Sequence, residues 1–153
     1  MVRYLGVDYG HKRVGLAVGD SDSGFAAPLC MLPGGDDAAA VRKISSLCKE
    51  YDCNVVIVGL AINMDGTIGP AATKTLTFAQ KLADCEGLEV RMWDERLSSF
   101  DADQTLAGTM TRKKRKARQD AVAAASFLNE FLSRNDRLAA LTPQQVVENA
   151  KKS

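Results

Sequence analysis

The feature that most constrains the fold is the run NVVIVGL at residues 54–60, which is largely apolar and rich in β-branched side chains. A strand with one face in water alternates apolar and polar residues, whereas an unbroken apolar run is typical of a strand buried on both faces. Such a strand lies inside a sheet that carries helices on both sides. The run therefore predicts an α/β fold with parallel pairing at this strand.

Shorter strand patterns lie on either side of this run. Residues 2–8 and 13–19 join through a tight turn and, together with residues 26–32, predict a meander of antiparallel strands. Residues 88–93, LEVRMW, predict the last strand.

Helix-start residues and helical apolar spacing place four helices between and after these strands. Asp36 or Asp37 can cap the first helix, Pro70 opens the second, and Ser98 with Asp101 resembles a capping box. The predicted helices run from the two aspartates to Tyr51, from Pro70 through Leu82, from about Ser98, and over the Ala-rich residues 119–132.

This order of elements predicts a mixed sheet with three antiparallel strands followed by parallel strands and with helices on both faces. Composition agrees, since 153 residues with 46% hydrophobic side chains suffice for one globular domain with a buried core. We assign residues 1–135 to that domain and residues 136–153 to a polar C-terminal tail.

Carboxylates stand at three positions that this fold brings to one end of the sheet. Asp8 ends the first apolar strand, and Asp94 and Glu95 follow the last one. Asp120 falls in the first turn of the Ala-rich helix, on its apolar stripe, so we expect it to face the sheet. Carboxylates gathered there would repel one another unless a cation neutralised them, and such oxygen ligands suit Mg²⁺ or Mn²⁺.

Each acid taken alone also has a plainer interpretation. Asp8 fits a turn at a strand end, Asp94 and Glu95 fit solvated partners of Arg96, and Asp120 fits a first-turn acid favoured by the helix dipole. What favours the metal site is the coincidence of three acids at sheet ends with a basic run that leads directly into the third.

That basic run stands out from a chain that is close to neutral overall. Residues 112–118, RKKRKAR, hold six of the twenty Lys and Arg residues and no acid, so the remaining 14 basic and 19 acidic residues carry a formal charge of −5. A solvated helix face would give the same pattern, but such asymmetry is typical of contact with a polyanion. The predicted nucleic-acid-binding residues are Arg13, Arg112, Lys113, Lys114, Arg115, Lys116 and Arg118.

The cysteine and histidine content argues against other kinds of site. The four cysteines include no C-x-x-C pair, and His11 is the single histidine, which disfavours a zinc site and a Ser-His-Asp or Cys-His mechanism. We expect reduced, packed thiols. Because the N-terminus lacks a secretory pattern and no apolar run approaches the roughly 18 residues of a membrane span, we expect a cytoplasmic protein with no membrane partner.

Four motifs, in this order, resemble the YqgF/RuvX family of pre-16S ribosomal RNA nucleases and Holliday junction resolvases. They are LGVDYGHKRVGLAV, VVIVGLAINMDGTIGP, DERLSS and RKKRKARQDAVAAASFL, which together span about residues 3–132. The resemblance implies an RNase H-like fold related to RuvC-type resolvases. One departure is Ala61, where the family pattern leads us to expect proline; it bears on the rigidity of that loop and not on the acids.

The resemblance also implies a role for each acid. Asp8 corresponds to the first catalytic carboxylate, Glu95 to the second and Asp120 to the third, with Asp94 an alternative to Glu95 as metal ligand. In a two-metal scheme with Mg²⁺ or Mn²⁺, Asp8 contacts both ions while Glu95 and Asp120 each hold one. One ion activates the attacking water and the other neutralises the leaving 3′ oxygen, so no histidine base and no organic cofactor are required.

The family favours the 5′ end of precursor 16S ribosomal RNA as the substrate, in ribosome biogenesis. Branched DNA is the first alternative, because phosphate contacts and a metal pair serve both substrates; a symmetric junction would suit a homodimer, although no amphipathic seam argues for one. An RNA-binding ribosome or transcription factor that does not cleave is the second alternative, and three intact acids count against it. A nucleotide-binding domain of the sugar-kinase, actin and Hsp70 type shares the D-x-G turn but needs two such domains.

Overall fold

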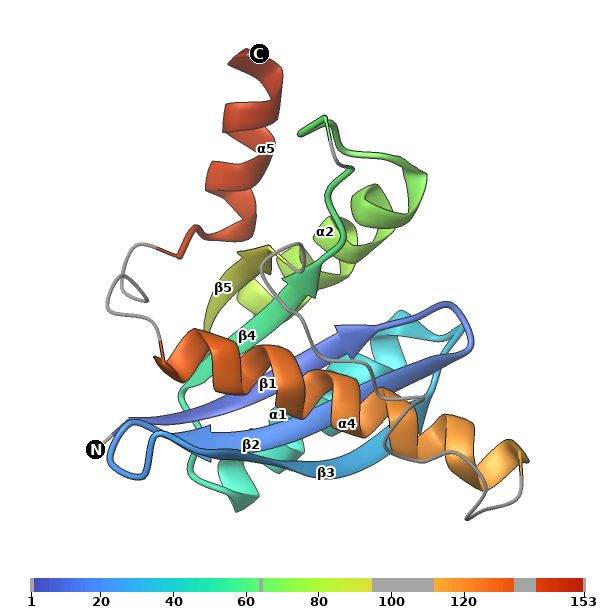
Figure 1. Ribbon diagram of the computed structural model, residues 1–153. Helices are drawn as coiled ribbons and strands as arrows, with labels where there is room; N and C mark the ends of the chain where they lie inside the picture. Colours follow the sequence, from blue (N-terminus) through green and yellow to red (C-terminus); the bar gives the residue numbers. More distant parts are fainter. Residues whose placement is uncertain (1, 64, 95–111, 134–139, 153) are drawn as a thin grey trace.

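The computed structural model describes residues 2–63, 65–94, 112–133 and 140–152, without the side chains of 112–120 and 150–152. Its centre is a five-stranded sheet in the order β3-β2-β1-β4-β5 (Figure 1). The strands β1 (Arg3–Tyr9), β2 (Arg13–Asp20) and β3 (Ala26–Pro33) are antiparallel, and β4 (Val55–Leu60) and β5 (Glu89–Asp94) run parallel to β1. The predicted mixed sheet is confirmed.

Strand β4 is buried on both faces, as its apolar run predicts. Val56 and Val58 lie in the core cluster on one side of the sheet, while Ile57 lies in the cluster on the other side, and all three are fully buried. Because β4 sits between β1 and β5 and pairs in parallel with both, the carboxyl ends of these three strands lie at one edge of the sheet.

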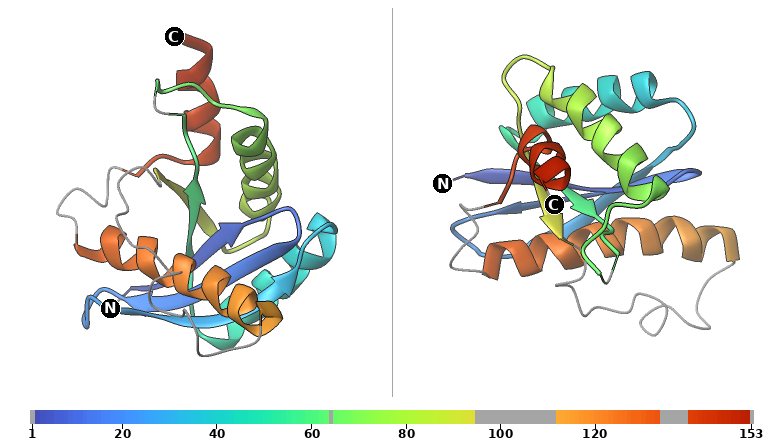
Figure 2. Two further views of the ribbon diagram at one scale, coloured as in Figure 1. Left: turned by 45° about the vertical axis from the view of Figure 1, so that its right-hand side comes forward. Right: turned by 90° about the horizontal axis from the view of Figure 1, so that it is seen from above.

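Helices cover both faces of the sheet, so the molecule has three layers, which the right-hand view of Figure 2 shows from above. The helices α1 (Asp37–Glu50) and α2 (Pro70–Ala83) cover one face, and α4 (Arg112–Ser133) crosses the other. Asp36 is the N-cap of α1, where its carboxylate accepts a hydrogen bond from the Ala39 N–H at 3.0 Å. Both predicted helix starts, at Asp36 and at Pro70, are confirmed.

Helix α4 begins at Arg112 and not at the predicted Gln119. Lys, Arg and Ala have high helix propensity, and the packed downstream part of the helix supplies the nucleus that the basic run extends. The backbone of residues 112–118 therefore forms the first turns of α4. The helix predicted from about Ser98 lies outside the described residues.

A further helix, α5 (Pro143–Lys152), lies within the predicted polar tail. The Leu141 carbonyl just before it accepts a hydrogen bond from the Met92 N–H at 2.7 Å, and Val146 packs into the core, so this segment covers the outer edge of β5. One apolar pair among polar residues gives too weak a periodic pattern to predict such a helix. The division of the chain at residues 135 and 136 stays a prediction. Nowhere in the described ranges is a helix both long and apolar enough to cross a membrane.

Candidate active site

Asp8 lies at the carboxyl end of β1, on the face of the sheet that α4 crosses. Side chains alternate along a strand, and Tyr4, on the same side as Asp8, packs edge-on against Phe131 of α4 with ring centroids 5.2 Å apart. In β2 the residue opposite Asp8 is Gly15, and in β4 the register that pairs Val7 with Val58 brings Gly59 level with it. The half-buried carboxylate of Asp8 thus has glycines on both neighbouring strands.

Asp94 ends β5 on the opposite face. Trp93 packs against Phe131 of α4 with ring centroids 5.6 Å apart, whereas Met92 lies in the cluster that α1 and α2 cover. Asp94 follows the alternation of Met92 and pairs in register with Leu60, which also belongs to the α1 and α2 cluster. Asp8 and Asp94 therefore lie on different faces. Glu95 lies outside the described residues.

Helix α4 crosses the sheet in the direction opposite to β1 and packs mainly on β2 and β3, so that its first turns lie toward the end of the sheet that carries Asp8. Its Phe131 packs on Tyr4, and a Cβ added to Gly6 would lie 3.2 Å from Leu128 and 3.3 Å from the Ala124 carbonyl oxygen. From Gly6 to Asp8 is about 6.6 Å along a strand, and four residues back from Ala124 is about 6 Å along a helix. Position 120 of the α4 backbone thus reaches the level of Asp8, although the side chain of Asp120 is not described.

Within the described ranges, no three His, Cys, Asp or Glu side chains are grouped so that they could hold a metal ion. Of the predicted ligands, only Asp8 and Asp94 have described side chains, and they lie on different faces of the sheet. The hard oxygen of Asp8 fits Mg²⁺ or Mn²⁺.

The two buried thiols, Cys48 and Cys53, do not offer an alternative nucleophile. All four cysteines are free, as predicted, and burial raises the pKa of Cys48 to about 12 and that of Cys53 to about 11. Cysteines of this kind stay protonated at neutral pH and are unreactive.

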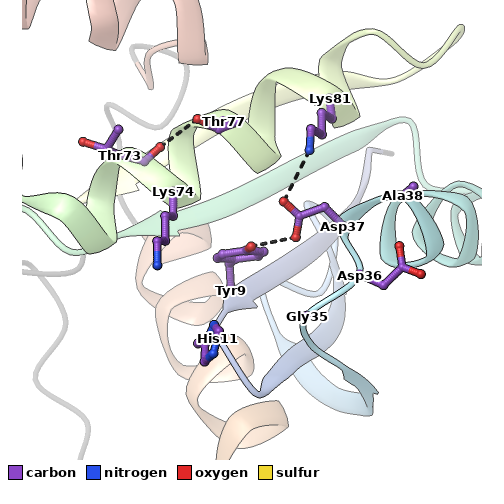
Figure 3. A pocket seen from close by; sticks show the side chains of 10 residues that line it. All are labelled: Tyr9, His11, Gly35, Asp36, Asp37, Ala38, Thr73, Lys74, Thr77 and Lys81. Carbon is purple, nitrogen blue, oxygen red and sulfur yellow. Dashed lines mark hydrogen bonds and ion pairs between the residues drawn. The ribbon is translucent and has the colours of Figure 1, made fainter.

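A pocket of about 440 Å³ opens beside Asp8, between the end of β1 and the start of α2. A second pocket, of about 690 Å³, lies between α1 and α2 and shares Tyr9, His11 and Lys74 with the first (Figure 3). The pocket beside Asp8 is lined by Asp8, Tyr9, Gly10, His11, Gly59, Ala61, Pro70, Ala71, Lys74 and Thr75.

Tyr9 ties the strand end next to Asp8 to both helices of the other layer. Its hydroxyl donates a hydrogen bond to the Asp37 carboxylate at 2.7 Å, and Lys81 pairs with Asp37 at 3.6 Å (Figure 3). The ring of Tyr9 packs against Phe78 with centroids 4.5 Å apart. Burial, reinforced by the hydrogen bond to Asp37 and its negative charge, raises the pKa of Tyr9 to about 12. The residue after Asp8 is thereby held by β1, α1 and α2 together.

The turn between β1 and β2 is packed against the segment that joins β3 to α1. The Gly34 N–H donates a hydrogen bond to the Lys12 carbonyl at 2.8 Å, and a Cβ on Gly10 would lie 2.6 Å from the Arg13 carbonyl oxygen, so only glycine fits there. Arg13 is half-buried at the start of β2, next to this turn. The side chains of the other predicted nucleic-acid-binding residues, 112–118, are not described.

The loop from β4 to α2 contains a turn at Asp65. The Asp65 carboxylate accepts hydrogen bonds from the Thr67 hydroxyl at 2.6 Å and the Thr67 N–H at 3.0 Å, and these bonds hold the pKa of Asp65 below its usual value. The loop ends at Gly69, which caps α2 without a side-chain hydrogen bond.

Residues 2–134 match the family described as "RuvX: Holliday junction resolvase". The chain belongs to the RuvX family. Among curated relatives, a Bacillus cereus (strain AH187) protein is 40% identical over 136 residues, which are 87% of this chain and 99% of that protein. A Bacillus thuringiensis (strain Al Hakam) protein is 40% identical over 134 residues, 86% of this chain and 98% of its own length. Both carry the name "Putative pre-16S rRNA nuclease".

The fold of this RuvX chain is similar to that of solved RuvC structures. Thermus thermophilus RuvC superposes with a TM-score of 0.53 at 16% identity, over 92% of this chain and 99% of RuvC. The same enzyme in complex with a Holliday junction substrate gives a TM-score of 0.53 at 15% identity, over 86% and 94% of the two chains. The predicted RNase H-like fold, which RuvC shares, is confirmed.

The sequence did not predict the pocket beside Asp8 or the contacts of Tyr9. Lys74 and Lys81 are ordinary surface lysines of a helix pattern, and Asp37 resembles any first-turn acid. The contacts between these residues depend on how α1 and α2 pack across β1, which no local sequence pattern indicates.

Proposed function

We propose that this protein is a nuclease that hydrolyses phosphodiester bonds with divalent metal ions held by Asp8, Glu95 and Asp120. The observation that carries the proposal is the position of Asp8, at the carboxyl end of β1 on the face that α4 crosses, in a member of the RuvX family. The register of α4 supports the third ligand, because it brings position 120 to the level of Asp8.

Strand alternation favours Glu95 over Asp94 as the second ligand. Asp94 lies on the face that α1 and α2 cover, whereas the next residue of an extended chain points to the face of Asp8. The hard oxygen ligands proposed here suit Mg²⁺ or Mn²⁺, which would activate the attacking water and stabilise the leaving 3′ oxygen.

The chain's own residues would place and hold the scissile phosphate. Asp8 is fixed by the strand pairing of β1 with β2 and β4, and Tyr9 anchors the next residue through Asp37 and Phe78. The basic first turns of α4 supply positive charge for the phosphate backbone on the same face. Rigid support of this kind keeps a catalytic group in its productive geometry.

The 5′ end of precursor 16S ribosomal RNA is the substrate that we propose, as part of ribosome biogenesis in the cytoplasm. The names of the 40% identical Bacillus relatives support this choice. The family description supports a second candidate, the resolution of Holliday junctions in branched DNA. That reaction cuts two symmetric strands and would require a homodimer, which mass measurement in solution can test.

A cleavage assay with the purified protein tests the proposal. The labelled substrates are precursor 16S RNA, an unrelated single-stranded RNA and a four-way DNA junction, each with and without Mn²⁺. We expect Mn²⁺-dependent cleavage of the precursor near its mature 5′ end and none by Asp8→Asn. Cleavage of the junction alone would favour the resolvase. Binding of RNA without cleavage under all conditions would favour the factor that does not cleave.

A further inference from the structure

We propose that the pocket of about 440 Å³ beside Asp8 binds one nucleotide of the strand being cut, next to the scissile bond, with Lys74 at its phosphate. This inference rests on the proposed nuclease function and assigns part of its substrate path. The volume of this pocket falls within the range of roughly 300–1,000 Å³ that is typical of small-ligand pockets.

The lining suits a nucleotide in shape. Four of the residues around the opening, Gly10, Gly59, Ala61 and Ala71, have no side chain beyond Cβ, so a sugar or base could enter without meeting bulky groups. Ala61 stands where the family resemblance leads us to expect proline, so in this chain that wall is formed by a smaller side chain.

The charge of the lining suits a phosphate at Lys74. Lys74 is exposed on α2 and extends toward the end of β1, where Tyr9 and His11 lie (Figure 3). None of the described acidic side chains forms an ion pair with it. A lysine that lines a pocket without a carboxylate partner among the described residues can donate to a phosphate oxygen without first breaking such a pair.

The neighbouring pocket is less suited to an anion. It contains Asp36 and Asp37, whose carboxylates are engaged in capping α1 and in the contacts with Tyr9 and Lys81. Lys81 offsets the charge of Asp37, so apart from the shared Lys74 this lining carries one net negative charge, which disfavours a phosphate there and leaves the end shared by Lys74 and His11, close to Asp8. Because α4 and α2 lie on opposite faces of the sheet, a strand that reaches Asp8 from the basic turns of α4 would pass round the carboxyl end of β1 to reach Lys74.

Binding measured in the Asp8→Asn background tests this site, because that change prevents cleavage and removes the repulsion between Asp8 and phosphate. The probes are a fluorescein-labelled single-stranded RNA and a labelled four-way DNA junction, followed by anisotropy without divalent metal. Adding Lys74→Gln should lower the slope of log affinity against log salt by about 0.7 for the single-stranded RNA and by about 0.9 for the duplex arms of the junction. For the single-stranded RNA, the ratio of the affinity of the Asp8→Asn protein to that of the double variant Asp8→Asn, Lys74→Gln should then shrink roughly two- to threefold between about 50 and 200 mM salt.

Two matched controls separate the pocket from general effects. Lys49→Gln makes the same charge change in the last turn of α1, at the other end of the sheet, and should leave the affinity nearly unchanged. Ala71→Leu fills the pocket and should weaken binding without changing the salt slope, whereas Ala83→Leu, at the exposed far end of α2, should not.

Equal affinity and salt slope for Lys74→Gln and Lys49→Gln on the bound probe would overturn the inference. If the wild-type protein then cleaves RNA with Mn²⁺, the nuclease proposal survives without this subsite. If no substrate is cleaved but Lys74→Gln still weakens binding, the subsite stands and the nuclease proposal fails. Absence of binding to both probes contradicts both.

Discussion

Gly6 of β1 and Leu128 of α4 meet without a side chain between the strand and the helix. A Cβ on Gly6 would lie 3.2 Å from the Leu128 Cβ and 3.3 Å from the Ala124 carbonyl oxygen. Both neighbours are fixed parts of the helix, since one is a Cβ and the other a backbone atom. Gly6 therefore sets the distance between α4 and β1 two residues before Asp8.

Gly6→Ala should force α4 away from β1. Overpacking a tight interface costs about 1–3 kcal/mol, so we expect the free energy of unfolding in urea to fall by that amount. Because α4 also carries Asp120, we expect kcat for cleavage to fall more than KM rises. Gly66→Ala is a control for a glycine substitution that causes backbone strain without a packing clash. Gly66 lies at an exposed turn with a φ of +87°, and no atom lies within 4 Å of the added Cβ. This control should reduce stability while leaving kcat unchanged.

Asp8→Asn, Glu95→Gln and Asp120→Asn should each remove a proposed ligand of the metal ions. Metal-bound stabilisation is worth several kcal/mol, so we expect each to lower the cleavage rate by roughly a hundredfold or more. In metal-free protein the melting temperature should stay at or above that of the wild type, since one source of carboxylate repulsion is gone. Cleavage by Asp8→Asn at the wild-type rate would exclude the metal mechanism.

Asp94→Asn is the matched control for the second acid. Asp94 pairs in register with Leu60 on the face that α1 and α2 cover, so we expect this change to leave most of the cleavage rate. A larger loss for Asp94→Asn than for Glu95→Gln would show that the chain leaves the alternation of β5 at this point and that Asp94 is the ligand.

Local signals were sufficient for most of the fold. Asp36 caps α1 through a bond to a residue three positions away, and Pro70 starts α2 by its own backbone restriction, so both are visible in the sequence. The β-branched run of β4 predicted burial on both faces, and the strand is buried on both faces. These features depend on nearest neighbours along the chain.

The features that the sequence did not reveal depend on packing between distant segments. Asp94 lies on the face that α1 and α2 cover because β5 pairs with β4 in a particular register, which the sequence alone does not reveal. Lys74 lines the pocket because the start of α2 packs beside the end of β1. Helix α5 is held against β5 because Val146 packs into the core cluster. No helix or strand period records such contacts, so sequence reasoning could name the acids but not the pocket beside them.

The basic first turns of α4 should contribute through phosphate contacts. Replacing Lys113, Lys114 and Lys116 with Gln should weaken binding to all sequences alike and reduce the slope of log affinity against log salt by about two units for single strands, if all three contact phosphate. Gln has a helix propensity close to that of Lys, so the helix should persist, which circular dichroism can check. An unchanged salt slope would assign these cations to a solvated helix face.

Tyr9→Phe should change how stability depends on pH in the alkaline range. In the folded protein the pKa of Tyr9 is raised from 10.0 to about 12, so the unfolded chain loses this proton first and the stabilising contribution of Tyr9 declines as pH rises from about 10 to 12. Below pH 10 we expect Tyr9→Phe to cost about 1 kcal/mol through the lost hydrogen bond to Asp37. Urea unfolding of both proteins at several pH values should show this difference shrinking above pH 10. A difference that stays constant up to pH 12 would mean that the hydroxyl of Tyr9 is not held by Asp37 and does not anchor the strand end that carries Asp8.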